Sequence, residues 1–397
     1  MTKITSPLHT AKTSSKIPPL EFKLQPANGH QPRYKNRIVP TPDFNLGKYT
    51  FKAVIDWVEV EIRLTTNSQV RHIQHSLLQT QSRKCFVKEI DGNGHGTSQA
   101  FRIKFQEPES LAFVAQRLEK LAKQHPYGTA PQVVDIEVSV DAYSHARRDI
   151  EHQRMVGLLT KTLYAKGEHF KSSLKKPRFT WGKLPKETEF VTPDTSNPLP
   201  PYVNVYDHDL YKSAAVDATF YLGARKHGSL TRIMHKVIDT QTKHTSKALA
   251  EDEKRARIEV RTGKDWLREN ELTEVADFRS YSFTKMQGDF FQFKLPLLGK
   301  TTPQSKSKFN DITGIDTFRN GGTIAVQGRD LLLKPFRSNV FKVLKAHLRR
   351  RGNPFRTPSI RKEGAVDFIS YSELSKNIRT ALQNLTDREG NAWRKLY

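Results

Sequence analysis

Strand-like alternation of apolar and polar residues recurs along the chain. It is clearest over 51–64, 133–143 and 255–263, where β-branched residues are also frequent. The segments 84–106 and 218–238 each contain two such stretches separated by a turn with glycine, which is typical of a β-hairpin. These patterns predict a mainly antiparallel sheet.

Segments with a helical spacing of apolar residues lie between these strands. They are 65–81, 109–124, 146–167, 265–280, 331–352 and 372–385. Because helices and strands are mixed along the chain, the expected fold class is α+β. We expect the helices to lie on one side of the sheet, where they would cover its apolar face.

Composition divides the chain into three regions. Residues 1–48 are rich in Pro, Ser, Thr and Lys without regular periodicity, so we expect a flexible basic arm. Residues 49–295 form the predicted α+β domain, in which the Pro-rich basic stretch 171–201 is expected to be a loop or a linker. Residues 296–397 are predicted to be a basic, largely helical C-terminal extension, with a basic amphipathic helix over 334–351.

The net charge indicates the kind of partner. The 397 residues include 66 Lys and Arg against 41 Asp and Glu, a formal charge of +25. Such an excess attracts polyanions, so we expect a nucleic acid as partner. The basic residues are spread along the chain, which disfavours binding to a membrane surface. Neither a bilayer-spanning run nor a secretory signal is evident, and we expect a soluble, cytoplasmic protein.

Two common kinds of site are excluded by the sequence. Cys85 is the only cysteine, so the chain can form neither an intramolecular disulfide nor a zinc site built of several thiolates. A GxxxxGK[ST] loop is absent, and we expect no ATPase.

Carboxylates are concentrated on one predicted strand. Alternate side chains of a strand share a face, so Asp135, Glu137, Ser139 and Asp141 are expected on one side of 134–143. Like charges this close destabilise one another unless a cation compensates them. A hard divalent ion, Mg²⁺ or Mn²⁺, would suit these oxygen ligands. A solvated face with Lys or Arg partners is the alternative.

Two further acidic residues are candidate ligands. Glu259 is expected to share a face with Arg257 and Arg261, either as a salt-bridged residue or as part of a metal site beside arginines that hold phosphate oxygens. Asp56 is expected on the face of the apolar residues in 58–62, where it would be half-buried and need a partner. That partner is either a metal or a backbone donor.

The predicted hairpin at 218–238 offers a nucleophile. A turn centred on 227–228 would place Tyr221 opposite Met234 on the same face. A tyrosine phenolate near a metal-bound phosphate can attack phosphorus and form a covalent link. Tyrosine is also common in strands for packing reasons alone. Lys236 is either a phosphate ligand or an exposed basic residue.

Five short motifs, taken in order, resemble the replication initiation factor family of rolling-circle plasmids and filamentous phages. They are IDWV at 55–58, VDIEVSVD at 134–141, FYLGARK at 220–226, RIMHK at 232–236 and RIEVR at 257–261. Each motif is weak by itself, whereas their order and spacing over about 50–265 are moderately specific. The resemblance implies an α+β nicking and origin-binding domain over 49–295.

What the resemblance implies about function is specific. Members bind a replication origin as double- and single-stranded DNA and nick one strand. A tyrosine becomes joined to the 5′-phosphate, and the free 3′-OH primes a host polymerase, with a host helicase as a further partner. The divalent ion, Mg²⁺ or Mn²⁺, would be held here by Asp135, Asp141 and Glu259, with Glu137 as an additional ligand.

DNA contacts are expected from the basic residues of these motifs and of the C-terminal basic helix. The residues concerned are Arg225, Lys226, Arg232, Lys236, Arg257, Arg261, Arg349, Arg350 and Arg351. Guanidinium and ammonium groups bind phosphate oxygens by charge-assisted hydrogen bonds. The strong salt dependence that such contacts confer would distinguish them from solvated surface charges.

The chain departs from the family at the expected nucleophile. Met234 stands where the family's Arg-Ile-Tyr-x-Lys motif has tyrosine, and a thioether cannot attack phosphate in this way. Tyr221 is our substitute, with Tyr202, Tyr206 and Tyr211 as rivals. The alternative hypothesis is a noncatalytic DNA-binding regulator of a phage or plasmid, built on the same scaffold.

Overall fold

The computed structural model describes most of the chain. The described residues are 2–12, 16–29, 31–78, 85–91, 96–172, 175–182, 187–193, 211–224, 228–240, 246–299, 314–332 and 366–396. Helices and antiparallel sheets are mixed throughout this part, so the α+β class is confirmed. Every strand pairing between described strands is antiparallel.

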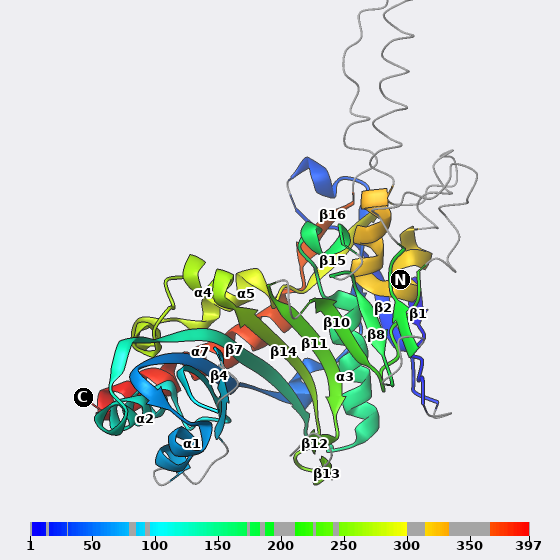
Figure 1. Cartoon of the computed structure of the whole chain (residues 1–397). Coiled ribbons are helices and arrows are strands. Elements are labelled where there is room, and N and C mark those ends of the chain that lie inside the picture. The colour runs from blue at the N-terminus through cyan, green and yellow to red at the C-terminus, as the bar shows by residue number, and fades with distance from the viewer. Residues whose placement is uncertain are drawn as a thin grey trace, which may run out of the picture.

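A nine-stranded sheet forms the centre of the molecule (Figure 1). Its strands, in spatial order, are β5 (Cys85–Glu89), β6 (Ser98–Gln106), β4 (Tyr49–Ser68), β7 (Tyr127–Ser144), β14 (Arg255–Gly263), β11 (Leu230–Lys236), β10 (Thr219–Gly223), β8 (Arg178–Thr180) and β9 (Thr188–Phe190). The long strands β4 and β7 pair along most of their length. They are the segments in which the sequence alternates most regularly.

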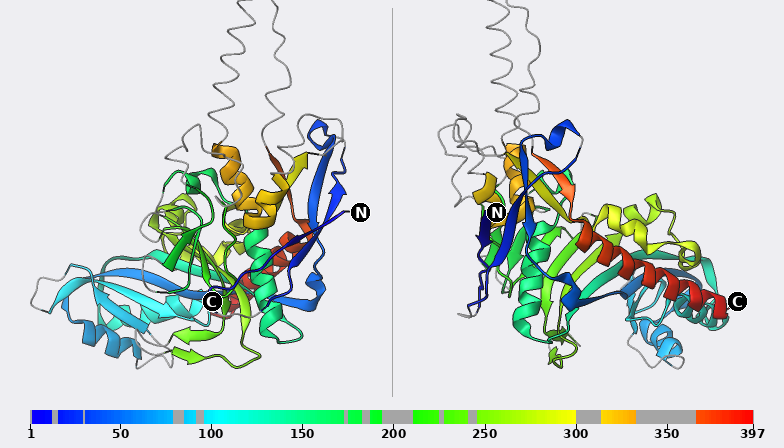
Figure 2. Two further views of the ribbon diagram at one scale, coloured as in Figure 1. Left: turned by 90° about the vertical axis from the view of Figure 1, so that its right-hand side faces the viewer. Right: turned by 180° about the vertical axis from the view of Figure 1, so that it is seen from behind.

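One face of this sheet is apolar. Val138 pairs with Ile55 on one side and with Val260 on the other, and all three side chains are buried. The helices are α1 (Val70–Leu78), α2 (Leu111–Gln124), α3 (Asp149–Thr162), α4 (Lys264–Glu269), α5 (Met286–Asp289) and α7 (Ser372–Leu396). In the view from behind, α7 crosses in front of the strands, which places it over one face of the sheet (Figure 2).

Helix α2 illustrates how the sequence sets a boundary. Ser110 caps the helix, because its hydroxyl accepts a hydrogen bond from the amide of Phe113 at 3.0 Å. The apolar residues that predicted this helix are buried, and α2 packs against α7. The carboxylate of Glu389 on α7 accepts the amide of Leu111 at 2.8 Å, so the two helices are also joined by a hydrogen bond.

The N-terminal region differs from the flexible arm expected over 1–48. It contributes β1 (Lys3–Ser6), β2 (Leu20–Pro26) and β3 (Arg37–Pro42) to a second sheet, with β15 (Lys294–Gly299) and β16 (Asp367–Ser370). Leu20 and Phe22 on β2 are fully buried in the core. These strands are short, and β3 pairs with β15 from more than two hundred residues away, so local periodicity does not reveal them.

Two further boundaries differ from the sequence prediction. Within the expected loop 171–201, β8 and β9 form one edge of the large sheet. Strand β15 crosses the expected boundary at 295–296, and α7 packs against β4, so the described C-terminal part belongs to the same core. Residues 314–332 are helical. The predicted basic helix over 334–351 lies outside the described residues.

Two further short strands lie outside both large sheets. They are β12 (Ile238–Thr240) and β13 (Ser246–Ala248), which pair with each other beyond the end of β11. None of the helices in the described part of the chain combines the length and the apolar character needed to cross a membrane.

Candidate active site

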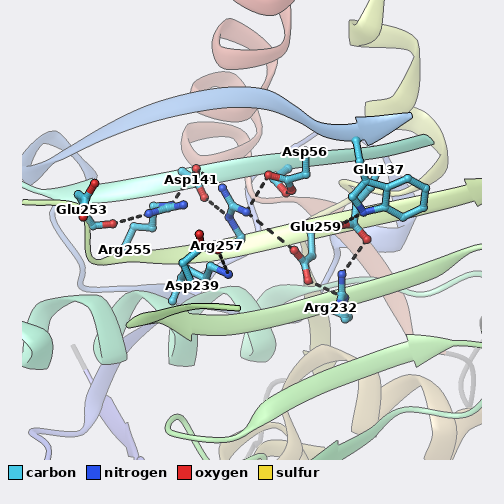
Figure 3. Close-up of polar contacts among 12 residues, drawn as sticks. Asp56, Glu137, Asp141, Arg232, Asp239, Glu253, Arg255, Arg257 and Glu259 are labelled. Atoms are coloured by element: carbon cyan, nitrogen blue, oxygen red, sulfur yellow. Dashed lines mark hydrogen bonds and ion pairs between the residues drawn. The ribbon is translucent and has the colours of Figure 1, made fainter. Parts of the chain in front are cut away.

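The second face of the large sheet carries charged side chains in a regular pattern (Figure 3). Tyr221 of β10 lies opposite Arg232 of β11, which lies opposite Glu259 of β14, which lies opposite Ser139 of β7. In the next row Met234 lies opposite Arg257, and Arg257 opposite Asp141. The alternation of β7 and β14 thus places acidic and basic residues side by side, as their sequences predict.

Arg257 is the most firmly held cation of this face. Its Nε and Nη2 donate to the two carboxylate oxygens of Asp141 at 2.6 and 2.7 Å. Its Nη1 donates to Oδ1 of Asp56 at 2.8 Å. Only 6% of the side chain is exposed. Buried bidentate contacts of this kind fix both partners, and Arg257 therefore positions Asp56 relative to β7.

Arg232 joins two carboxylates from different strands. Its Nη2 donates to Oε2 of Glu137 at 2.7 Å, and its Nε lies 2.5 Å from Oε1 of Glu259. The indole Nε1 of Trp57 donates to the other oxygen of Glu137 at 2.8 Å. Sequence reasoning did not single out Trp57, although it directly follows Asp56 in the first motif.

Asp56, Glu137 and Glu259 form a buried acidic group. Each offers a carboxylate oxygen, and these three oxygens lie within 4.8 Å of one another. The residues come from β4, β7 and β14, so three neighbouring strands hold the group together. We call these residues the carboxylate trio. An all-oxygen set of this kind matches the preference of Mg²⁺ or Mn²⁺, and the residues fit such an ion.

Burial and mutual repulsion disfavour the charged forms within the trio. Burial raises the pKa of Glu259 to about 7, with Arg232 opposing the shift and Glu137 and Asp56 adding to it. Burial also raises the pKa of Asp56, against the effect of Arg257 and the hydrogen bond from Ser139. Three carboxylates held together in this way are stabilised by any cation that reaches them.

Asp56 does not lie on the face that the sequence predicted. The pairing of β4 with β7 shifts register between Ile55, which faces Val138, and Trp57, which faces Glu137. Asp56 is the extra residue of this β-bulge, and its side chain joins the charged face instead of the apolar face. Simple alternation fails here because a bulge reverses the phase of every residue that follows.

The four predicted metal ligands are divided between two environments. Glu137 and Glu259 belong to the carboxylate trio. Asp141 is paired with Arg257, and Asp135 accepts Arg261 Nε at 2.6 Å. Burial raises the pKa of Asp135 to about 6, and its Oδ1 has no hydrogen-bond partner among the described residues. The structure thus groups Asp56 with Glu137 and Glu259, whereas the resemblance implied Asp135 and Asp141 as ligands beside Glu259.

Tyr221 lies on the charged face, but its partner differs from the prediction. It is opposite Arg232, whereas the sequence predicted Met234. Gly223 pairs with Leu230, so the hairpin is centred one position earlier than predicted and the partner of Tyr221 moves by two residues. A shift of two preserves the face, and Tyr221 remains on the same side as Met234. Arg178 lies over the Tyr221 ring, 5.4 Å from its centroid.

The rival tyrosines are less well placed or are not described. Tyr211 is 2% exposed, and burial raises the pKa of its hydroxyl well above the ordinary value. It is therefore a poor nucleophile. Tyr202 and Tyr206 lie outside the described residues, as do Arg225, Lys226, Arg349, Arg350 and Arg351.

The predicted DNA-binding residues that are described already have acidic partners. Arg232, Arg257 and Arg261 contact the carboxylates given above, and the Lys236 ammonium lies 3.7 Å from Asp239. Arg257 is enclosed, while the Arg232 side chain is 30% exposed. A phosphate that approaches this face would therefore meet Arg232 more readily than Arg257.

A second group of possible ligands lies where α3 packs on β11. Asp149, His152 and His235 bring their ligand atoms within 4.8 Å of one another, a group that the sequence analysis missed. The backbone amide of Ser144 donates to Nε2 of His152 at 3.1 Å. An amide can only donate, so the proton of neutral His152 must lie on Nδ1. Neither ring nitrogen then has a free lone pair for a metal, and the trio is the better site.

Comparison with known proteins adds no relative. No protein-family model matches the chain, and a search of curated proteins finds no match.

Proposed function

We propose that the chain is a rolling-circle replication initiator that nicks one DNA strand through Tyr221. One observation carries the proposal: Tyr221 and the carboxylate trio share one face of the sheet, with Arg232 between them. The order of the five motifs supports the same class of protein. The fold expected for this class is a specific form of the α+β architecture described above.

The spacing of the strands leaves room for a phosphate. Strand β11 separates Tyr221 on β10 from Glu259 on β14. Neighbouring strands lie about 4.8 Å apart, so the two backbones are about 10 Å apart. Both side chains extend from the same face. A phosphodiester between the phenol and the carboxylates would thus also reach Arg232.

The proposed reaction is a transesterification. The Tyr221 oxygen loses its proton to solvent or a base and forms a bond to phosphorus, while the bond from phosphorus to the 3′-oxygen breaks. The 3′-oxygen takes up a proton and leaves as the free 3′-OH. Asp56, Glu137 and Glu259 would hold the divalent ion, which when bound stabilises negative charge on the phosphate. Arg232 would bind a phosphate oxygen.

A noncatalytic DNA-binding regulator remains the second candidate, on one specific observation. Each member of the acidic trio already forms an ion pair with Arg232 or Arg257, so the trio has counter-charges without a metal. Met234 in the family's tyrosine position agrees with this alternative. It predicts binding to the replication region with no covalent product.

A nicking assay separates the two candidates. Supercoiled DNA carrying the region that flanks the gene is incubated with the protein and Mn²⁺, and open circles are counted. We expect nicking that is lost in Tyr221→Phe and in Glu259→Gln. Tyr143→Phe is the matched control, because Tyr143 lies on the same strand as Asp141 and contacts Arg255 away from the trio. Binding without nicking in the unaltered protein would favour the regulator.

A further inference from the structure

The two arginines beside the carboxylate trio are held in different ways. Arg257 is clamped by both oxygens of Asp141 and is 6% exposed. Arg232 is not held by two oxygens of one carboxylate: within the described part of the chain its ion pairs are with Glu137 and Glu259, and 30% of its side chain is exposed. One arginine is thus part of the framework, and the other has a route to solvent.

Arg232 lies where its charge compensates the negative charge of the trio. The three carboxylates carry up to three negative charges, and Arg257 is shared with Asp141. Arg232 is therefore the main cation that the trio has to itself. Its contacts reach Glu137 and Glu259, which are two of the three candidate ligands. A divalent ion on the same oxygens would repel the guanidinium at close range.

We propose that Arg232 acts as an internal counter-ion of the metal-free protein and is displaced from Glu137 and Glu259 when a divalent ion binds. This inference rests on the metal site of the proposed function. The displaced guanidinium can turn towards solvent, because 30% of the Arg232 side chain is exposed, and it stays beside Tyr221, which lies directly opposite on β10. Metal binding would then release a cation beside the nucleophile, where a DNA phosphate must lie.

Metal affinity without DNA gives the first test. Mn²⁺ is titrated into the full-length protein at pH 8 and followed by calorimetry. Removing the competing charge in Arg232→Gln should tighten Mn²⁺ binding about tenfold, since one nearby unit charge is lost. Arg255→Gln is the matched control: Arg255 lies 3.1 Å from Asp141 on the same face but outside the trio. We expect this control to change the affinity less than about threefold.

The outcomes distinguish this inference from the function on which it rests. Equal or weaker Mn²⁺ binding by folded Arg232→Gln would overturn the displacement of Arg232. If Glu259→Gln still abolished binding, the metal site itself would stand. Absence of Mn²⁺ binding in both the unaltered protein and Arg232→Gln would overturn the metal site and the inference together.

A second measurement takes its readout from the unaltered protein, so it does not depend on the folding of Arg232→Gln. Arginine Nε–H signals of the unaltered protein are recorded by NMR during a Mg²⁺ titration, with Arg232→Lys used for assignment. The Arg232 signal should shift as its bond to Glu259 is lost, and the Arg257 signal should stay because Asp141 retains it. An Arg232 signal that does not move at saturating Mg²⁺ would contradict the inference.

Discussion

Arg257 donates from Nε and Nη2 to both carboxylate oxygens of Asp141, across the pair formed by β14 and β7. The same guanidinium reaches Asp56 on β4, so one side chain joins three strands. Because all three residues are buried, their charges depend on one another for compensation. The charged face is therefore a structural element as well as a candidate active site.

Removing Arg257 should strongly destabilise the fold. Arg257→Met leaves Asp141 and Asp56 buried with one cation fewer, and we expect a loss of about 3–5 kcal/mol in the free energy of unfolding. Arg63→Gln is the control, because Arg63 pairs with Asp91 on the surface with more than half of each side chain exposed. It should cost less than about 1 kcal/mol. Urea unfolding measures both, and similar losses would show that Arg257 has no special role.

The membership of the metal site can be tested residue by residue. Glu259→Gln should abolish Mn²⁺ binding, since Glu259 is a member of the trio. Asp135→Asn should leave the affinity within about threefold, because Asp135 is paired with Arg261 instead. Calorimetric titration of both variants with Mn²⁺ shows which of the two carboxylates is a ligand. Loss of binding in Asp135→Asn as well as in Glu259→Gln would restore the ligand set implied by the resemblance, which includes both residues.

Much of the charged face could be predicted from sequence because strand alternation is a local property. The shared face of Glu137, Ser139 and Asp141, and that of Arg257, Glu259 and Arg261, follow directly from the two-residue period. The position of Asp56 does not follow, since a bulge changes the phase. The partner of Tyr221 depends on where the hairpin is centred, which alternation does not determine.

Local sequence patterns did not predict the second sheet. Strands β1 to β3 are short, β2 and β3 contain prolines, and the composition of this region resembles that of a flexible segment. They are stable because β3 pairs with β15 and because Phe22 packs edge-on against Phe318. Such contacts join residues that lie hundreds of positions apart. The trio has the same origin, for it is assembled from three strands that are separated along the chain.

Acid should destabilise the protein through His235. Burial lowers the pKa of His235 to about 4, near Asp149, His152, Lys254 and Glu251. The unfolded chain, with an ordinary pKa near 6.5, binds the proton first. The contribution of His235 to the free energy of unfolding is thus fully present above pH 6.5. It is lost as the pH drops towards 4, by about 1.4 kcal/mol per pH unit for one proton.

His235→Gln removes this contribution. Urea unfolding between pH 7 and pH 4.5 should give a shallower pH dependence in the variant than in the unaltered protein. His75→Gln, on α1 and away from this group, is the control. An unchanged slope in His235→Gln would mean that His235 is protonated equally well in the folded and unfolded chains.

Gly322 should not tolerate a side chain. Its φ is +72°, and an added Cβ would lie 2.5 Å from the carbonyl oxygen of Lys161. Gly322→Ala should therefore lower the free energy of unfolding by about 2–3 kcal/mol. In Gly390→Ala nothing lies within 4 Å of the new Cβ, which is inside α7. That control should stabilise the helix by about 0.5–1 kcal/mol. Thermal unfolding of both variants would show whether Gly322→Ala lowers the melting temperature while Gly390→Ala raises it.

The most direct test of the proposed function is to identify the residue joined to DNA. The protein is incubated with Mn²⁺ and the supercoiled replication region, denatured, digested with protease and nuclease, and analysed by mass spectrometry. We predict a nucleotide linked through its 5′-phosphate to the peptide that contains Tyr221. DNA bound with no covalent adduct, or an adduct at a different tyrosine, would contradict the assignment of Tyr221 as the nucleophile.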